Sequence, residues 1–208
     1  LEPDYGTFAS ICFILFSQLF FSKIKIIYPS LTIFASILPL YFVATSSEYR
    51  LSRIETWLSR KCDYGVDLLG DCFQLNQSRI AISSGGLFGL GPGTSRARWG
   101  SLPNSYSDFI SSIIGEEYGF FGLFLLVLAF FILISTTFLI AIREKNEIKK
   151  LISVGFGSWL FFQTVVNLGG AVGIVPITGI VLPFVSYGSS AMISIFIALG
   201  IMYSRDYE

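Results

Sequence analysis

The sequence predicts an all-α, polytopic membrane protein with five transmembrane helices. Three observations support this fold class: of the 208 residues, 53% are hydrophobic and only 13% are charged, and the mean hydropathy is +0.69. Soluble domains carry about 25% charged residues, so the composition is typical of a chain that lies in lipid. We expect a single membrane domain over residues 1–208 with one large loop outside the membrane.

Uncharged runs locate the spans, because a charged side chain at the bilayer centre costs about 2.5–3.5 kcal/mol on insertion scales. A helix needs about 20 residues to cross the hydrocarbon core. The stretch from 151 to 203 contains no charge, is too long for one span, and is interrupted by glycine and proline. We therefore expect two spans there. The five predicted spans cover about 5–22, 26–46, 114–142, 151–168 and 187–203.

The short loops orient the chain, because Lys and Arg accumulate on the cytoplasmic side of membrane proteins. Basic residues lie between the first and second spans, between the third and fourth, and after the fifth, namely Lys23, Lys25, Arg143, Lys145, Lys149, Lys150 and Arg205. These three places fall on one side of a chain with five spans. The loop 45–108 and the Gly/Pro-rich loop 169–186 are then expected on the outer side.

Composition excludes several classes of function. The formal net charge is zero, which argues against a nucleic-acid partner. Histidine is absent, which removes the usual general base near neutral pH and most zinc sites. Acid–base chemistry therefore falls to carboxylates. Cys62 and Cys72 could form a disulfide if their loop faces an oxidising compartment, but we expect them to stay unpaired.

The loop 45–108 carries most of the candidate binding residues. Its polar side chains suited to an anion or a sugar are Arg50, Arg53, Gln74, Gln77, Ser78, Arg96 and Arg98. Arginines spaced three apart share a helix face, either as part of a solvated interfacial helix or as an anion clamp, since guanidinium groups suit phosphate. The glycine-rich stretch 85–93 lacks the Lys-Ser/Thr ending of a phosphate loop, and alone it indicates a re-entrant or interfacial loop.

Carboxylates stand at the entry to the third span. Asp108 precedes a predicted helix, so it can cap that helix or handle sugar hydroxyls. Glu116 and Glu117 can be acids favoured by the helix dipole, yet ionised groups at that depth are expensive and usually functional. Gln163 and Asn167 share a face of the fourth span, where a pair of polar side chains most often joins helices.

Six motifs, in this order, resemble those of the SEDS family of bacterial membrane proteins, the shape, elongation, division and sporulation polymerases that include FtsW, RodA and SpoVE. The matching segments are 3–7 (PDYGT), 49–53 (YRLSR), 73–78 (FQLNQS), 85–103 (GGLFGLGPGTSRARWGSLP), 107–122 (SDFISSIIGEEYGFFG) and 175–190 (VPITGIVLPFVSYGSS). The IIGEE and SRARW segments are most similar to the FtsW/SpoVE branch. Departures from the family pattern are Asn104, Tyr106, Arg98 and Ser189, which stand where the family has Glu, His, Lys and Gly.

The resemblance implies a ten-span fold of which this chain would supply the last five. It implies a peptidoglycan glycosyltransferase that polymerises lipid II, leaving undecaprenyl pyrophosphate, at the outer face of the bacterial cytoplasmic membrane during cell division. The essential carboxylate would be Asp108, and Ser186 and Tyr187 join the substrate-binding set. A class B penicillin-binding protein transpeptidase and divisome proteins would be the partners. A divalent cation, Mg²⁺ or Mn²⁺, is a candidate cofactor, with Asp108 as general base or as metal ligand.

Two rival functions stay open. The first is a flippase for lipid-linked sugars, which would place polar residues through the full depth of the membrane. The second is a non-catalytic scaffold of the division machinery. Polar side chains gather at the outer end of the predicted spans, and this favours chemistry at the membrane surface.

Overall fold

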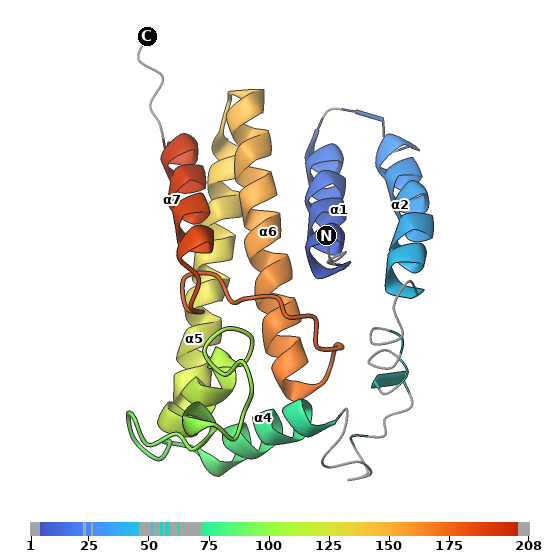
Figure 1. Ribbon diagram of the computed structural model, residues 1–208. Coiled ribbons are helices and arrows are strands. Elements are labelled where there is room, and N and C mark those ends of the chain that lie inside the picture. The colour runs from blue at the N-terminus through green and yellow to red at the C-terminus, as the bar shows by residue number, and fades with distance from the viewer. Residues whose placement is uncertain are drawn as a thin grey trace.

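The computed structural model shows a helical protein (Figure 1). It describes residues 5–22, 24–25, 27–45, 51, 55, 57–58, 62 and 72–203. The helices are α1 (Tyr5–Phe21), α2 (Ile27–Thr45), α4 (Phe73–Ser84), α5 (Ile110–Arg143), α6 (Glu147–Val172) and α7 (Ser189–Tyr203), with a 3₁₀ turn, η2 (Ala97–Trp99). Within these described ranges there is no β-strand, so the all-α prediction is confirmed.

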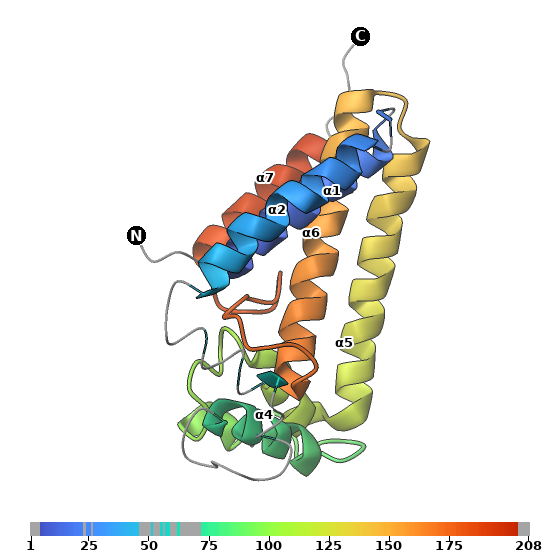
Figure 2. The same cartoon turned by 90° about the vertical axis from the view of Figure 1, so that its right-hand side faces the viewer.

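The α6 helix lies at the centre of the bundle. It contacts α1, α5 and α7 along its length and α4 at one end. The α2 helix packs on α1 at the edge of the bundle, and α4 lies across the ends of α5 and α6 (Figures 1 and 2). The described segments that hold candidate site residues, on α4, around η2 and at the start of α5, therefore meet at the end of the bundle that α4 covers.

Two helices, α5 and α6, are long and apolar enough to cross a membrane. Shorter apolar segments lie in α1, α2 and α7, at Gly6–Phe21, Ile27–Pro39 and Ala191–Met202. Each predicted span overlaps one of these five helices, although α5 begins several residues earlier than expected. The count of five spans stays a prediction.

Apolar packing divides between the bundle and its covered end. One cluster joins α6 to α7 through Phe156, Leu160, Ile195 and Met202. The second lies under α4 and holds the loop residues against the start of α5 and the end of α6; its members are Ala81, Ala97, Leu102, Phe109 and Ala171. The segment from α4 to the start of α5 thus has a core of its own, which fixes its loops to the helices.

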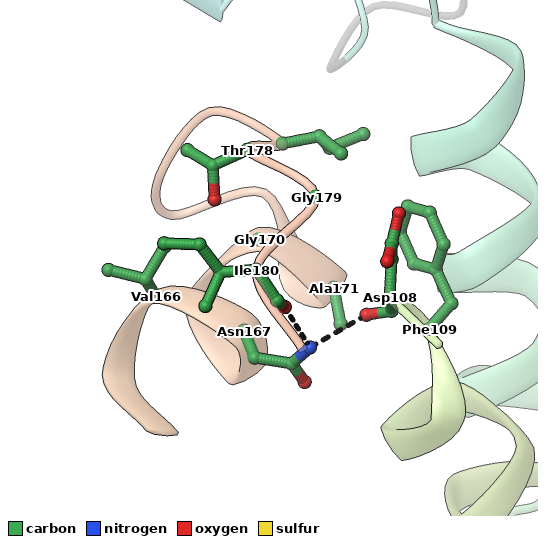
Figure 3. Close-up of a pocket in the computed structure, with 10 residues that line it drawn as sticks. Asp108, Phe109, Val166, Asn167, Gly170, Ala171, Thr178, Gly179 and Ile180 are labelled. Atoms are coloured by element: carbon green, nitrogen blue, oxygen red, sulfur yellow. Dashed lines mark hydrogen bonds between the residues drawn. The ribbon is translucent and has the colours of Figure 1, made fainter. Parts of the chain in front are cut away.

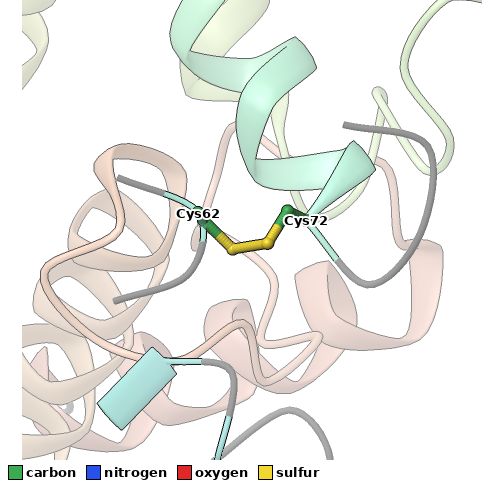
Figure 4. Close-up of a disulfide and its surroundings, with 2 residues drawn as sticks. All are labelled: Cys62 and Cys72. Atoms are coloured by element: carbon green, nitrogen blue, oxygen red, sulfur yellow. A yellow bond between two sulfur atoms is a disulfide. The ribbon is translucent and has the colours of Figure 1, made fainter. Parts of the chain in front are cut away.

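Cys62 and Cys72 form a disulfide, so the expectation that they stay unpaired is wrong (Figure 4). Cys72 is fully buried at the start of α4, and the two Cα atoms lie 5.3 Å apart. This separation is in the usual range for disulfides. The sequence spacing alone does not reveal this proximity, because it depends on how the loop returns to α4.

The α5 helix is broken at Gly119, whose φ of 66° and ψ of −159° lie in a region essentially restricted to glycine. The break leaves the N–H groups of Phe120 and Phe121 without their helical acceptors. They donate instead to the carbonyls of Gly86 and Leu87, at 2.8 and 3.2 Å. The loop between α4 and η2 therefore completes the hydrogen bonding of the second part of α5.

The same loop, residues 85–93, also bonds the last carbonyls of the first part of α5. We call it the glycine loop. Its Leu90 and Gly91 N–H groups donate to the carbonyls of Glu116 and Glu117, both at 3.0 Å. A Cβ atom on Gly89 would lie 2.1 Å from the Glu117 carbonyl oxygen, so the approach requires glycine. Gly89 thus allows close contact between the two backbones, and the N–H groups of Leu90 and Gly91 are bonded to α5.

Candidate active site

Asp108 is half-buried in the last turn before α5. Its N–H donates to the carbonyl of Asn104 at 3.1 Å. The assigned capping position of α5 is Phe109, which makes no side-chain capping bond. That Asp108 caps this helix stays a prediction.

Asn104 shapes the turn that presents Asp108. Its φ is 54°, a left-handed conformation that Asn tolerates better than most residues. Its carbonyl accepts from the N–H groups of Ser107, Asp108 and Phe109, at 3.2, 3.1 and 3.4 Å. At this position, where the family pattern has Glu, the residue acts through its backbone conformation.

Three consecutive carbonyls that end at Asp108 are held by residues from the C-terminal part of the chain. We call these three donors the clasp, and they are Asn167, Ser186 and Tyr187. The bonds are Tyr187 N–H to Tyr106 O at 3.0 Å, Ser186 Oγ to Ser107 O at 2.5 Å, and Asn167 Nδ2 to Asp108 O at 2.9 Å. The clasp fixes the backbone around Asp108 to α6 and to the segment that leads into α7.

Two side-chain amides of α6 also bind the α6–α7 connection (residues 173–188). Asn167 Nδ2 donates a second bond to Ile180 O at 2.7 Å. Gln163, with its amide oriented to satisfy both neighbours, donates to Val181 O at 3.2 Å and accepts from Trp159 Nε1 at 2.7 Å. The expected role of Gln163 and Asn167 in joining helices is thus met through segments next to the helices, because both bind this connection and Asn167 also binds the turn before α5.

The Asp108 carboxylate lies beside the Phe109 ring and points away from the Asn167 amide (Figure 3). A small pocket forms here between the turn at Asp108, the end of α6 and residues 177–180 of the connection. Gly179, with φ of 75°, comes so close that a Cβ atom there would lie 3.8 Å from Asp108 Oδ2. The pocket volume is about 10 Å³, room for about one water molecule, so a sugar ring would meet the carboxylate from outside it.

Glu116 anchors the arginine-bearing segment next to this site. Its carboxylate is 3% exposed and accepts from Ser95 Oγ at 2.6 Å, from Arg96 N at 3.1 Å and from Ala97 N at 3.2 Å. Ser95 Oγ in turn accepts from Arg98 N at 3.1 Å. Glu116 therefore positions the arginines, and its functional contribution is indirect.

The two arginines of this segment differ in their surroundings. Arg96 is exposed. Arg98 Nε donates to the Tyr106 hydroxyl at 3.3 Å, and the guanidinium lies 5.6 Å from the Trp99 ring centre and 5.7 Å from that of Tyr106. The hydrogen bond with Tyr106 raises the pKa of Arg98. Arg98 is thus a permanent cation held by Tyr106, and Tyr106 lies two residues before Asp108 in the sequence.

Other predicted binding residues serve packing in this structure. Ser78 is fully buried, contrary to the expectation that it faces a ligand; its Oγ donates to Ala171 O at 2.6 Å and bonds Ser112 Oγ at 2.7 Å. Glu117 is 7% exposed, and its Oε1 has no hydrogen-bond partner among the described residues. The Ser78 hydroxyl thus joins α4 to α5 and α6.

The remaining candidates fall into three groups. Gln74 and Gln77 are half-buried on α4. The Tyr187 side chain is 85% exposed, so it is accessible to a ligand, whereas its backbone belongs to the clasp. Arg50 and Arg53 lie outside the described residues.

Sequence reasoning missed two functional features. Ser95 was not singled out, although its hydroxyl links Glu116 to Arg98, and a serine beside arginines carries no distinctive signal. The role of Asn167 toward Asp108 was also missed, since the two residues lie far apart in the sequence. The Asn side chain inside an apolar helix was the available signal, because such groups require a partner.

The whole chain matches a model of a known protein family. A family model described as "Cell cycle protein", covering FtsW, RodA and SpoVE, matches residues 1–208. The chain belongs to the FtsW/RodA/SpoVE family. The predicted resemblance is therefore confirmed over the whole chain.

Two relatives in this family are each named "Probable peptidoglycan glycosyltransferase FtsW". The one from Buchnera aphidicola subsp. Acyrthosiphon pisum is 37% identical over 210 residues, covering 100% of this chain and 52% of the relative. The one from Wigglesworthia glossinidia brevipalpis is 34% identical over 212 residues, covering 100% of this chain and 54% of the relative. The chain thus spans about half the length of these FtsW relatives.

A solved structure shares the fold of this FtsW/RodA/SpoVE chain. It matches with a TM-score of 0.69 and 27% identity, covering 96% of this chain and 55% of that chain. The work that describes it is titled "Structural coordination of polymerization and crosslinking by a peptidoglycan synthase complex". The helical arrangement seen here is therefore that of about half of a chain in a known peptidoglycan synthase complex.

Proposed function

We propose that this chain carries the active site of a peptidoglycan glycosyltransferase that polymerises lipid II into glycan strands during cell division. The observation that supports it most is the clasp, which holds the backbone from Tyr106 to Asp108 beside a segment of positioned arginines. The printed names of its FtsW relatives point to the same activity. A carboxylate on an anchored backbone turn and an arginine held by Tyr106 suit a reaction whose leaving group is a pyrophosphate.

The proposal includes a topology. Five helices cross the bacterial cytoplasmic membrane, and the loop 45–108 and the α6–α7 connection lie on its outer face. The Cys62–Cys72 disulfide supports this placement, because disulfides persist in oxidising compartments and are rare in the cytosol. Asp108 then lies where two lipid-tethered substrates can meet.

The proposed reaction joins the 4-hydroxyl oxygen of an acceptor GlcNAc to C1 of a donor MurNAc. Asp108 accepts the hydroxyl proton as the new C–O bond forms, and the bond from C1 to the pyrophosphate oxygen breaks. Undecaprenyl pyrophosphate leaves with the bonding electron pair. A general base of this kind typically contributes about 10²–10⁴ in rate.

The arginines stabilise the leaving group. Negative charge grows on the pyrophosphate as the bond breaks, and donors fixed in advance lower the energy of that charge. Arg98 is fixed by Tyr106 and Trp99, and the backbone of Arg96 is fixed by Glu116. Arg50 and Arg53 are further candidates for this role, as the sequence predicted.

A divalent cation, Mg²⁺ or Mn²⁺, is compatible with the site in one arrangement only. Among the described residues no three acidic, cysteine or histidine side chains come together as a metal site. Mg²⁺ is often held by one or two carboxylates together with substrate phosphates and water. Asp108 would be its protein ligand, and the cation would offset charge on the pyrophosphate.

The solved relative belongs to a peptidoglycan synthase complex, and this supports a partner that acts in the same pathway. We propose a class B penicillin-binding protein transpeptidase and other divisome proteins as partners. The competing functions, a flippase for lipid-linked sugars and a non-catalytic scaffold, predict no polymer.

The test asks whether the purified protein converts lipid II into glycan polymer. The protein assayed contains residues 1–208 and has the full length that its gene encodes, and we call it the gene-length protein. It is assayed in detergent with its transpeptidase, and residues 1–208 alone are assayed in parallel. Polymer from the gene-length protein supports the glycosyltransferase. Absence of polymer together with movement of labelled lipid II across vesicle membranes would establish the flippase instead, and absence of both would leave the scaffold.

A further inference from the structure

The glycine loop exposes large apolar side chains at its tip. Leu87 is 61% exposed, Phe88 is 79% exposed and Leu90 is 50% exposed. The chain has no charged residue from 80 to 95. Exposed apolar side chains that gather in one patch mark surfaces that contact a protein partner, a ligand or a membrane, and this tip has that character.

The tip is held rigidly against α5. Four backbone hydrogen bonds join the glycine loop to the two sides of the break at Gly119. The Phe88 ring stacks on the Phe121 ring, with centres 5.2 Å apart and planes at 27°. The loop tip is therefore a lateral extension of the α5 surface.

The α5 surface beside the tip is apolar and exposed as well. Phe120, Phe121 and Phe124 are 58%, 48% and 52% exposed, and their rings contact one another in sequence. Only 11% of the most apolar window of α5 is buried, and no charged residue follows Glu117 until Arg143. We call the surface formed by Leu87, Phe88, Phe120, Phe121 and Phe124 the apolar collar.

We propose that the apolar collar docks the segment from α4 to the start of α5 into the outer leaflet of the bilayer, with the tip of the glycine loop among the acyl chains just below the headgroups. The collar continues the surface of a helix that is apolar enough to span a membrane, which favours lipid over a soluble partner. Tyr118, 48% exposed at the break, adds the amphipathic ring typical of membrane interfaces.

Such docking would set the depth of the candidate site. The carbonyl of Glu116 binds the glycine loop, and its carboxylate binds the arginine-bearing segment. Anchoring the loop in lipid therefore holds the arginines at headgroup level, where phosphate groups of a lipid-linked substrate would lie. The docking itself does not rest on the proposed activity, because it follows from the exposed apolar surface.

The test measures the depth of a spin label at residue 88. The gene-length protein carries Cys12→Ser, so that the remaining cysteines in residues 1–208 are the disulfide pair, and one added cysteine, Phe88→Cys. Phe131→Cys, on the exposed face of mid-α5 (66% exposed), and Ser101→Cys, in an exposed polar turn, serve as references. The protein is placed in vesicles of phosphatidylethanolamine and phosphatidylglycerol, and collision rates with O₂ and with the water-soluble nickel chelate NiEDDA are recorded.

We expect the ratio of O₂ to NiEDDA collisions at residue 88 to be several-fold above that at residue 101 and below that at residue 131. A ratio equal to that at residue 101 would place the tip in water and overturn the proposal. Low collision rates with both reagents would mean that protein covers the tip, and would also overturn it. Leu87→Cys repeats the measurement with the Phe88–Phe121 stack intact, and no lipid II is needed.

Discussion

The side-chain nitrogen of Asn167 donates to the carbonyl oxygen of Asp108 at 2.9 Å and to that of Ile180 at 2.7 Å. One amide group thereby joins the turn before α5 to the connection before α7. Both hydrogens of this nitrogen are used, and the side chain is 4% exposed. The position of Asp108 thus depends on a residue near the C-terminal end of the fold's most central helix.

Replacement of Asn167 by Leu should slow polymerisation more than it weakens substrate binding. The variant leaves two carbonyls without their donor, at a cost of about 1–3 kcal/mol in stability for each buried group. Displacement of a catalytic group by about 1 Å can cost about 10²-fold in rate. Steady-state kinetics with lipid II should show a fall in kcat with little change in KM.

The matched control is Gln163→Leu, one turn earlier on the same face. Gln163 holds the α6–α7 connection at Val181 but does not bond the Asp108 turn. Its variant should lose stability with a smaller loss in kcat. Equal losses of kcat in both variants would show that Asn167 acts only through the stability of the connection.

Replacement of Glu116 by Gln should loosen the arginine-bearing segment. Three donors now converge on the carboxylate, and a Gln amide would turn its NH₂ group toward at least one of them. We expect a loss of about 1–3 kcal/mol in stability, the usual cost of an unmet buried group. Hydrogen exchange at Arg96 and Ala97 should accelerate.

The control for this change is Glu117→Gln at the next position. Glu117 is also buried, but its Oε1 has no hydrogen-bond partner among the described residues. Exchange at residues 96 and 97 should change little in this variant. If Glu117→Gln accelerated exchange there as much as Glu116→Gln, the three bonds to Glu116 would not be what holds the segment.

Replacement of Gly119 by Ala should destabilise the protein severely. The added Cβ would lie 2.4 Å from Gly89 N, and the backbone conformation at Gly119 is essentially restricted to glycine. Thermal unfolding in detergent should show a lower Tm. Gly200→Ala in α7 is the control, since a Cβ there meets nothing within 4 Å and should raise or preserve the Tm. An unchanged Tm for Gly119→Ala would mean that α5 is continuous.

The Cys62–Cys72 disulfide provides a direct test of topology. In intact cells, a membrane-impermeant maleimide should not label either cysteine until an impermeant reductant is added. Labelling should then appear without permeabilising the cells, because the proposed topology places the loop on the outer face. A Cys62→Ser, Cys72→Ser variant controls for labelling at Cys12. Labelling only after permeabilisation would place the loop on the cytoplasmic side.

Much of the fold follows from hydropathy. Each predicted span overlaps an apolar helix, because the exclusion of charge from lipid determines where helices lie. The break at Gly119 was not predicted, since it depends on the glycine loop, thirty residues earlier, replacing the lost hydrogen bonds. Periodicity and hydropathy carry no information about such a partner.

The sequence predicted which residues belong to the candidate site, but it predicted the roles of those residues only in part. Asp108, Arg96 and Arg98 lie in neighbouring loop segments at the end of the bundle, as their spacing suggested. Glu116 and Ser78 were expected to bind a ligand, but they bind protein, because a buried polar group takes whatever partner the fold brings to it. Which partner that is depends on tertiary contacts that a single sequence does not contain.

The rate of glycan polymerisation by Asp108→Asn tests the central claim most directly. The substitution keeps the shape of the side chain and removes its ability to accept a proton. With saturating lipid II, we expect a loss of about 10²–10⁴ in rate, as for removal of a general base. Glu144→Gln, at the far end of α5, should leave the rate unchanged. A rate for Asp108→Asn equal to that of the unaltered protein would contradict the assignment of Asp108.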